Sequence, residues 1–266
     1  MKRALPAALV VLAAALALAF LVLPIAAIFL RVSPGRLLHQ LSSPIVTDAL
    51  IVSFKTTAIA QVLILVFGTP LAWLLASRRF RGRGLAVTLV ELPLVLPPAV
   101  AGIGLLAAFG RAGLLQTGIP FTQTAVVFAV AFVSSPLYIR QAVAVFEAVD
   151  PNLVAASRTL GAGPVRTFFR VVVPLSRGGL AAGEALAFAR GLGEFGATIM
   201  FAGSLQGVTQ TLPLAIYSAF AINFNTALAM GALLVVVSAL LLVFLKLVLS
   251  WRSSQPTSSF LFARST

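Results

Sequence analysis

The chain has 266 residues, of which 60% are hydrophobic and 9% charged, and its mean hydropathy is +1.09. No water-soluble domain has this balance, so the composition predicts an all-α, polytopic membrane protein. There is no cysteine, which excludes disulfides and thiolate metal sites, and the single histidine, His39, cannot make a metal cluster. We therefore expect no metal site on this chain.

Six apolar stretches are each long enough to cross a bilayer, and segments that contain Pro, Gly or Arg separate them. The expected transmembrane helices are 4–30, 48–77, 85–109, 121–145, 175–201 and 226–249. They form a single transmembrane domain over residues 1–250, followed by a polar tail at 251–266 that we expect to be disordered from residue 255. We also expect a loop at 31–47 and a short helix at 212–220, which either lies on the lipid surface or contacts another protein.

The first stretch follows Lys2 and Arg3, so a cleaved signal peptide is an alternative to a retained helix. Its apolar run is longer than the core of a signal peptide, and no clean cleavage site with small residues follows it. We interpret it as the first transmembrane helix.

The distribution of basic residues predicts the topology. With the N-terminus in the cytoplasm, fourteen Lys and Arg residues lie on the cytoplasmic side and three on the other side. This is the bias that the positive-inside rule describes, and it places both termini and the loop after the fourth span in the cytoplasm. Basic helix ends beside anionic lipid headgroups also explain the net charge of +13 without a nucleic-acid partner.

A polar segment at 150–174 separates the fourth and fifth spans. Asp150 is a good N-cap and Pro151 fits the first helical position. Gly161 is a typical helix end, and a second short helix is expected to end near Pro174. The segment therefore predicts a helical hairpin on the membrane surface, although an ordinary amphipathic connector is the alternative.

One motif in this hairpin resembles a known family. Ala155-Ala156-Ser157, three residues, Gly161, nine residues and Val171-Val172-Val173-Pro174 resembles the pattern E-A-A, three residues, G, nine residues, I-x-L-P of ABC-importer permeases. Ala155 replaces the Glu and Ser157 replaces the second Ala. The resemblance implies that the loop 147–174 docks into a groove on a separate ATPase subunit. The docking residues would be Asp150, Pro151, Ala155, Ala156, Ser157, Leu160, Gly161, Ala162 and Pro174.

Further segments resemble the permease subunits of molybdate importers, from residue 51 to 249. The most specific is ARGLGEFGATIMFAG followed by TQTLPLAIY; the others are SFKTTAIAQ, GTPLAWLLASRRFRGR and ELPLVLPPAVAGIGLL. The resemblance implies a type I ABC importer permease fold in a bacterial or archaeal inner (plasma) membrane. It also implies a homodimer, two ATPase subunits that carry ATP and Mg, and an extracytoplasmic binding protein. Tungstate or sulfate is the alternative cargo.

Two groups of residues are candidates for the translocation pathway or gate. Pro93, Pro97 and Pro98 remove backbone donors from the third span, which predicts a bent helix, either lining a pore or serving only packing. The fifth span carries Glu184, Arg190 and Glu194, and ionisable residues inside membranes usually face the bundle interior or water. Arg190 and Glu194 are four residues apart, so on one helix they would share a face and could form a structural pair or border the pathway. Thr198 on the same span is a further candidate.

Lys55, near the outer end of the second span, either reaches toward the interface or attracts an anion at the pathway mouth. The chain has no G-x-x-x-x-G-K-[ST] motif and no visible catalytic constellation, so we expect neither a nucleotide site nor enzymatic activity on this chain. A secondary anion transporter is the rival class, but such proteins often carry internal repeats, and no second copy of the proline-broken span or of the hairpin is visible.

Overall fold

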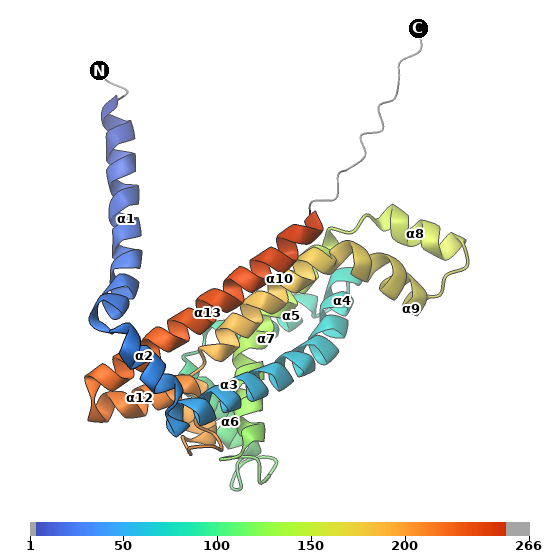
Figure 1. Ribbon diagram of the computed structural model, residues 1–266. Helices are drawn as coiled ribbons and strands as arrows, with labels where there is room; N and C mark the ends of the chain where they lie inside the picture. The colour runs from blue at the N-terminus through green and yellow to red at the C-terminus, as the bar shows by residue number, and fades with distance from the viewer. Residues whose placement is uncertain (1–3, 254–266) are drawn as a thin grey trace. The chain divides into compact units, whose positions relative to one another are not determined.

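The computed structural model describes residues 4–253, and all regular elements in that range are helices (Figure 1). The chain divides into two compact units. Unit 1 comprises Met1–Ala60, Leu96–Val133 and Gly191–Ala239, and unit 2 comprises Gln61–Val95, Ser134–Arg190 and Leu240–Thr266.

The helices follow one another with short connections. In chain order they are α1 (Ala4–Arg31), α2 (Pro34–Leu41), α3 (Pro44–Leu63), the π-helical turn η1 (Ile64–Gly68), α4 (Thr69–Ser77), α5 (Arg83–Val95), α6 (Pro98–Phe109), α7 (Gln123–Glu147), α8 (Pro151–Thr159), α9 (Pro164–Thr167), the π-helical turn η2 (Phe168–Val172), α10 (Val173–Leu192), α11 (Gly196–Ala202), α12 (Leu212–Ile222) and α13 (Phe224–Ser253). Among the described residues, five helices are long and apolar enough to cross a membrane, or six if α5 and α6 form one broken span. This agrees with the expected all-α, multi-span fold.

The prediction of a loop at 31–47 is wrong, because most of this segment is helical. Helix α2 begins at Pro34 and α3 begins at Pro44. Proline fits the first position of a helix, since the backbone N–H that it lacks has no intrahelical partner there. The same prolines that suggested a loop therefore start helices. The predicted tail at 255–266 lies outside the described residues.

The third span is interrupted, as its prolines suggested, but it forms two helices and not one bent helix. Helix α5 ends at Val95 and α6 begins at Pro98. Pro97 has an extended ψ of 132°, and its carbonyl accepts the N–H groups of Val100 at 2.9 Å and Ala101 at 3.1 Å. The break is thus a helix start built on two consecutive prolines.

The fifth span differs from the prediction at both ends. The second hairpin helix does not stop near Pro174, because α9, η2 and α10 form one continuous stretch from Pro164 to Leu192. The expected continuous helix 175–201 is also wrong, since α10 ends at Leu192 and α11 begins only at Gly196.

Both π-helical turns end two residues before a proline. Turn η1 ends at Gly68 before Pro70, and η2 ends at Val172 before Pro174. A proline ring clashes with the carbonyl four residues earlier in a regular α-helix, and it cannot donate to that carbonyl. A π turn widens the helix just there, so each helix passes its proline without a break.

In unit 1, helices α3, α12 and α13 share an apolar core. Its fully packed residues are Val46, Ala49, Leu212, Ala215, Met230 and Leu233. The Leu212 N–H, at the start of α12, donates to Ser53 Oγ on α3 at 2.8 Å. The short helix expected at 212–220 is therefore confirmed, and it is packed within the protein on one face.

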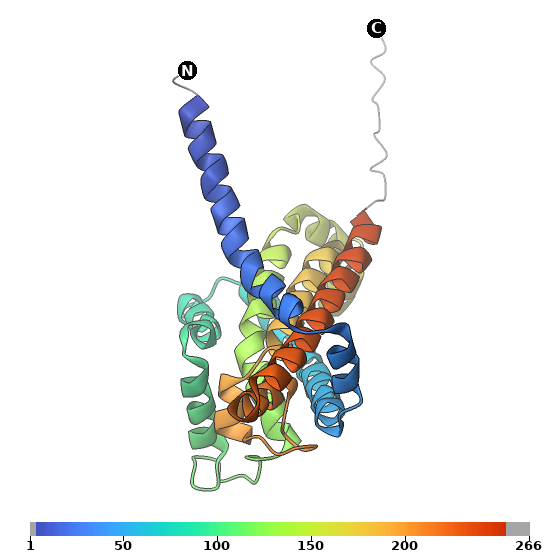
Figure 2. The same ribbon diagram turned by 60° about the vertical axis from the view of Figure 1, so that its left-hand side comes forward.

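Helix α6 lies against α11 in the same unit (Figure 2). The contact is so close that a Cβ on Gly102 would lie 2.6 Å from the Ala197 carbonyl oxygen and 2.7 Å from Met200 Cβ. Two residues further along α6, Gly104 has no described heavy atom within 4 Å of such a Cβ. Only Gly102 is therefore required to be small.

This contact predicts that Gly102→Ala destabilises the protein. Because the nearest obstacle is backbone, the two helices must separate, and we expect a loss of about 1–3 kcal/mol. Gly104→Ala on the same helix is the matched control and should be neutral or slightly stabilising, since alanine is the better helix former. Thermal unfolding of the purified protein in detergent measures the difference, and equal melting temperatures for the two variants would contradict the close contact.

Candidate functional site

Helix α8 has well-formed ends, which fix the hairpin predicted at 150–174. The Asn152 N–H donates to the Asp150 side chain at 2.8 Å, so Asp150 is the N-cap, and Pro151 occupies the first helical position. At the other end Gly161 has φ +83°, and the Ala162 N–H donates to the Ser157 carbonyl at 3.1 Å. A residue in this left-handed conformation ends a helix and turns the chain back. The predicted start and stop of the first hairpin helix are confirmed.

A side-chain hydrogen bond ties the two arms of the hairpin together. Ser157 Oγ on α8 lies 3.1 Å from Thr167 Oγ1 at the end of α9, and Thr167 is buried. The family pattern has Ala at the position of Ser157, so the motif itself predicts no side-chain hydrogen bond there. The structure gives its hydroxyl a partner, and this bond holds α8 against the stretch that continues into α10.

The outer surface of the hairpin is exposed and partly apolar. None of the described residues of α8 is buried, and Ala155 and Ala156 are both exposed. Leu153, Leu160 and Val165 expose 47%, 88% and 70% of their surface. Exposed apolar clusters of this kind are typical of protein contact sites. Pro174, the last residue of the motif, is exposed near the start of α10.

Three aromatic rings support the base of the hairpin. Trp73 on α4 lies 5.6 Å from Phe146 on α7 and 5.4 Å from Phe168 in η2, measured between ring centroids, and Phe146 and Phe168 are 5.8 Å apart. Edge-to-face and tilted aromatic contacts add to the energy of apolar burial. Nothing in the spacing of these three residues along the chain indicates that their rings meet.

Glu194 caps the short helix α11. Its Oε1 accepts the Ala197 N–H at 2.8 Å, and the residue is only 2% exposed. Thr198, one residue further, is fully buried. Arg190 is half-buried near the end of α10, which stops at Leu192. The prediction that one helix carries both Arg190 and Glu194 is therefore wrong, because α10 ends between them.

Three further pathway candidates also have defined positions in unit 1. Lys55 Nζ donates to the neutral side chain of Gln123 at 2.9 Å, so Lys55 links α3 to the start of α7 while its charge is not neutralised by this bond. Pro97 and Pro98 are exposed at the start of α6. A Cβ on Gly196, the first residue of α11, would lie 2.7 Å from Pro98 Cβ, so the two helix starts lie close together.

Comparison with known proteins identifies the family. Residues 68–254 match the family described as the binding-protein-dependent transport system inner membrane component. The chain belongs to this family. The match covers the hairpin at 150–174 and both broken spans, and the family is one of ABC-importer permeases, which are transport subunits without an ATPase site of their own.

Curated relatives of this permease carry names that refer to molybdenum. The molybdenum transport system permease protein ModB of Mycobacterium tuberculosis is 45% identical over 230 residues, which cover 83% of this chain and 86% of the relative. A probable molybdenum ABC transporter permease protein of Haloferax volcanii is 40% identical over 80% of this chain and 78% of the relative. ModB of Escherichia coli is 41% identical over 64% of this chain and 78% of the relative.

Solved structures show the same fold. A bacterial ABC transporter involved in the import of the polysaccharide alginate matches with a TM-score of 0.62 at 17% identity, over 93% of this chain and 96% of that chain. The MetNI methionine ABC transporter in an inward-facing conformation matches with a TM-score of 0.60 at 19% identity, over 77% of this chain and 93% of that chain. The permease therefore has the type I ABC-importer fold.

The turn of the hairpin predicts different effects for two exposed glycines. Gly161→Ala forces an alanine into the left-handed region at a cost of about 1–2 kcal/mol, so the end of α8 should open more often. We expect amide hydrogen exchange in α8 to become roughly 5-fold faster, as follows from a loss of local stability of about 1 kcal/mol.

Gly163→Ala is the matched control. Gly163 has φ −67°, and neither glycine has a described heavy atom within 4 Å of an added Cβ. Exchange in α8 should be unchanged in this variant, and equal exchange in both variants would show that the conformation of Gly161 does not set the helix end.

Proposed function

We propose that this chain is the membrane-spanning subunit of an ATP-driven molybdate importer. The observation that carries the proposal is the 45% identity, over 83% of the chain, to a relative named a molybdenum transport system permease protein. The hairpin at 150–174, with an exposed apolar surface, supports it, because a permease of this kind needs a surface for a separate ATPase.

The proposed complex contains two copies of the permease, two ATPase subunits and one extracytoplasmic binding protein. Each permease presents one hairpin, so a pair of ATPase subunits is matched by a pair of permeases. The ATPase subunits bind ATP and Mg, and their closure on ATP moves the hairpins. The permeases then alternate between outward- and inward-facing states, and the assembled complex hydrolyses ATP although this chain has no nucleotide motif.

In the proposed topology both termini and the hairpin lie in the cytoplasm. The large excess of Lys and Arg on this side supports the orientation. The connection between α11 and α13, including α12, then faces the outside, where the binding protein delivers the ion. The docking residues proposed on the hairpin are those that match the family motif and its flanks, together with the N-cap Asp150.

Elemental mass spectrometry of whole cells tests the cargo. Cells that lack this gene should contain less molybdenum than the parent when molybdate is scarce and sulfate is in excess, and the gene should restore it. A loss of tungsten alone would move the assignment to a tungstate importer. No change in either metal, in cells without a redundant importer, would overturn the molybdate proposal.

A charge on the hairpin should abolish docking. Leu160→Glu places a carboxylate on a side chain that is 88% exposed beside the turn, so the permease should fold but lose the apolar contact with its ATPase. Leu115→Glu is the control, since Leu115 is 62% exposed in the loop that the proposed topology places outside. Co-purification with the ATPase subunit measures the effect. Retention of the ATPase by the Leu160 variant would contradict the docking role of this surface.

A further inference from the structure

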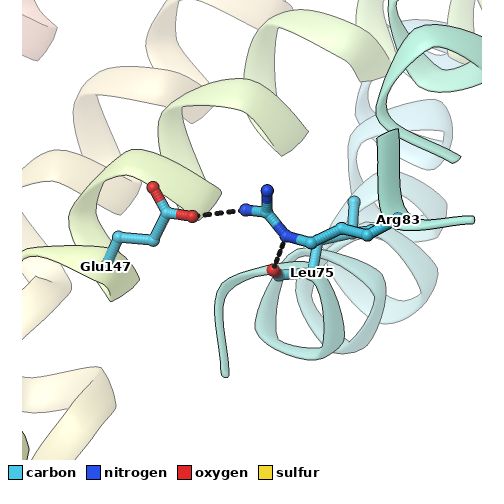
Figure 3. A network of polar contacts seen from close by, with 3 residues as sticks. All are labelled: Leu75, Arg83 and Glu147. Atoms are coloured by element: carbon cyan, nitrogen blue, oxygen red, sulfur yellow. Dashed lines mark hydrogen bonds and ion pairs between the residues drawn. The ribbon is translucent and has the colours of Figure 1, made fainter. Parts of the chain in front are cut away.

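Arg83, the first residue of α5, joins the ends of three helices in unit 2 (Figure 3). Its Nε donates to the carbonyl of Leu75 at 2.8 Å, near the end of α4. Its Nη2 donates to Glu147 Oε1 at 2.5 Å, on the last residue of α7. The planar guanidinium can make both bonds at once, whereas a lysine ammonium has no such fixed fork.

Both charges of this pair lie at the unfavourable ends of their own helices. A helix N-terminus carries a partial positive charge, yet α5 begins with the cation Arg83. A helix C-terminus carries a partial negative charge, yet α7 ends with the anion Glu147. Neither residue therefore stabilises its own helix, and what each gains is the bond to the other helix.

A second ion pair of opposite polarity connects the same two helices. Arg140 Nε on α7 lies 3.1 Å from Glu91 Oε1 on α5. The pairs are separated by eight residues along α5 and seven along α7, which is about 12 Å and about 10.5 Å at the usual helical rise. Because these two spacings are similar and the order of the partners is reversed, both ion pairs form at one alignment of two antiparallel helices. We call the four residues Arg83, Glu91, Arg140 and Glu147 the α5 clasp.

Burial alone does not fix α5. None of the described residues of α5 is buried, in contrast to α6, which follows it. The α5 clasp is thus a specific attachment of α5 to α7. On the other side α5 leads directly into the break at Leu96–Pro97.

The position of the α5 clasp connects it to the docking hairpin. Glu147 is three residues before Asp150, the N-cap of α8, so a movement of the hairpin acts directly on the end of α7. We propose that the α5 clasp makes α5 and the end of α7 move as one body with the hairpin. The movement that the ATPase imposes would then reach the proline break of the third span. This inference rests on the proposed function as an ATP-driven importer, but not on which ion is carried.

The exposure of the clasp makes the proposal testable. The side chains of Arg83 and Glu147 are 35% and 47% exposed, and those of Arg140 and Glu91 are 61% and 38% exposed. The Arg83–Glu147 pair lies at helix ends, where an exposed ion pair contributes little to folding stability, so variants that break this pair should still fold and assemble. A loss of coupling in such a variant therefore reports on the transmission of movement.

Charge reversal tests each pair separately. In the complete complex in liposomes, the singles Arg83→Glu, Glu147→Arg, Glu91→Arg and Arg140→Glu should raise the ATP hydrolysed per ion imported by roughly 5-fold, the lower end of typical coupling effects. The doubles Arg83→Glu with Glu147→Arg, and Glu91→Arg with Arg140→Glu, should bring this ratio back toward that of the wild type.

Arg81→Glu is the control, because Arg81 is exposed before α5 and has no ion-pair partner within residues 4–253. Single reversals without effect, or doubles no better than the singles, would overturn the proposal.

Distance measurement tests the movement itself. The chain has no cysteine, so Thr88→Cys on α5 and Ala144→Cys on α7, both exposed, take spin labels at defined places. In the complete complex the distance between the labels should be the same without nucleotide and with a non-hydrolysable ATP analogue, and Arg83→Glu should broaden its distribution. A distance that changes on binding of the analogue in the otherwise wild-type complex would show that α5 moves independently. If the wild-type complex imports no molybdate, the proposed function fails, while the label distances still decide on the clasp.

Discussion

The fold depends on one constraint: a helix inside a bilayer can be interrupted only where the protein itself supplies partners for the freed backbone groups. At 193–195 the partner is Glu194, whose buried carboxylate accepts the Ala197 N–H. At the break after α5, Pro97 and Pro98 have no N–H to satisfy, and the Pro97 carbonyl accepts two N–H groups of α6. In both interruptions, residues of the break itself supply the hydrogen-bond acceptors for the helix that follows. The two interruptions lie where α6 and α11 meet, with Gly102 and Gly196 at the contact. Glu194, a candidate for the pathway, thus also has a structural task.

Unit 2 satisfies the same constraint in a different way, since two of its helical stretches pass a proline without an interruption. The stretches that pass Pro70 and Pro174 remain helical, because a π-helical turn before each proline removes the clash and shifts the hydrogen bonds. The hairpin is consequently continuous with α10 through η2, and the aromatic contact of Trp73, Phe146 and Phe168 holds this stretch against α4 and α7. The second arm of the hairpin therefore runs into the span as one uninterrupted helical stretch from Pro164 to Leu192, whereas α8 joins it through the turn at Gly161.

The sequence predicted those features that depend on one local residue type. The apolar stretches predicted the spans, Asp150 with Pro151 predicted the start of α8, and Gly161 predicted its end. Features that depend on a competing local effect were missed. Pro34 and Pro44 suggested a loop, although proline is equally suited to begin a helix. The break at Glu194 was missed because glycines in membrane helices usually serve close packing, so Gly191, Gly193 and Gly196 did not mark an interruption. Contacts distant in sequence, such as Ser157 with Thr167 or Arg83 with Glu147, leave no pattern along a single chain.

These assignments change where selectivity for an oxyanion can reside. Two polar candidates have structural partners: Lys55 binds Gln123, and Glu194 caps α11. The Gln123 amide leaves the charge of Lys55 in place, so this residue can still draw a dianion toward the entrance by long-range attraction. Attraction of this kind acts on every dianion of the same charge, and therefore it does not separate molybdate from sulfate. If the chain carries molybdate, as we propose, the attraction by Lys55 raises the local concentration of the ion without selecting it. The task of the permease is then to open a path at the right moment, which is a matter of how the hairpin, α7 and α5 move together.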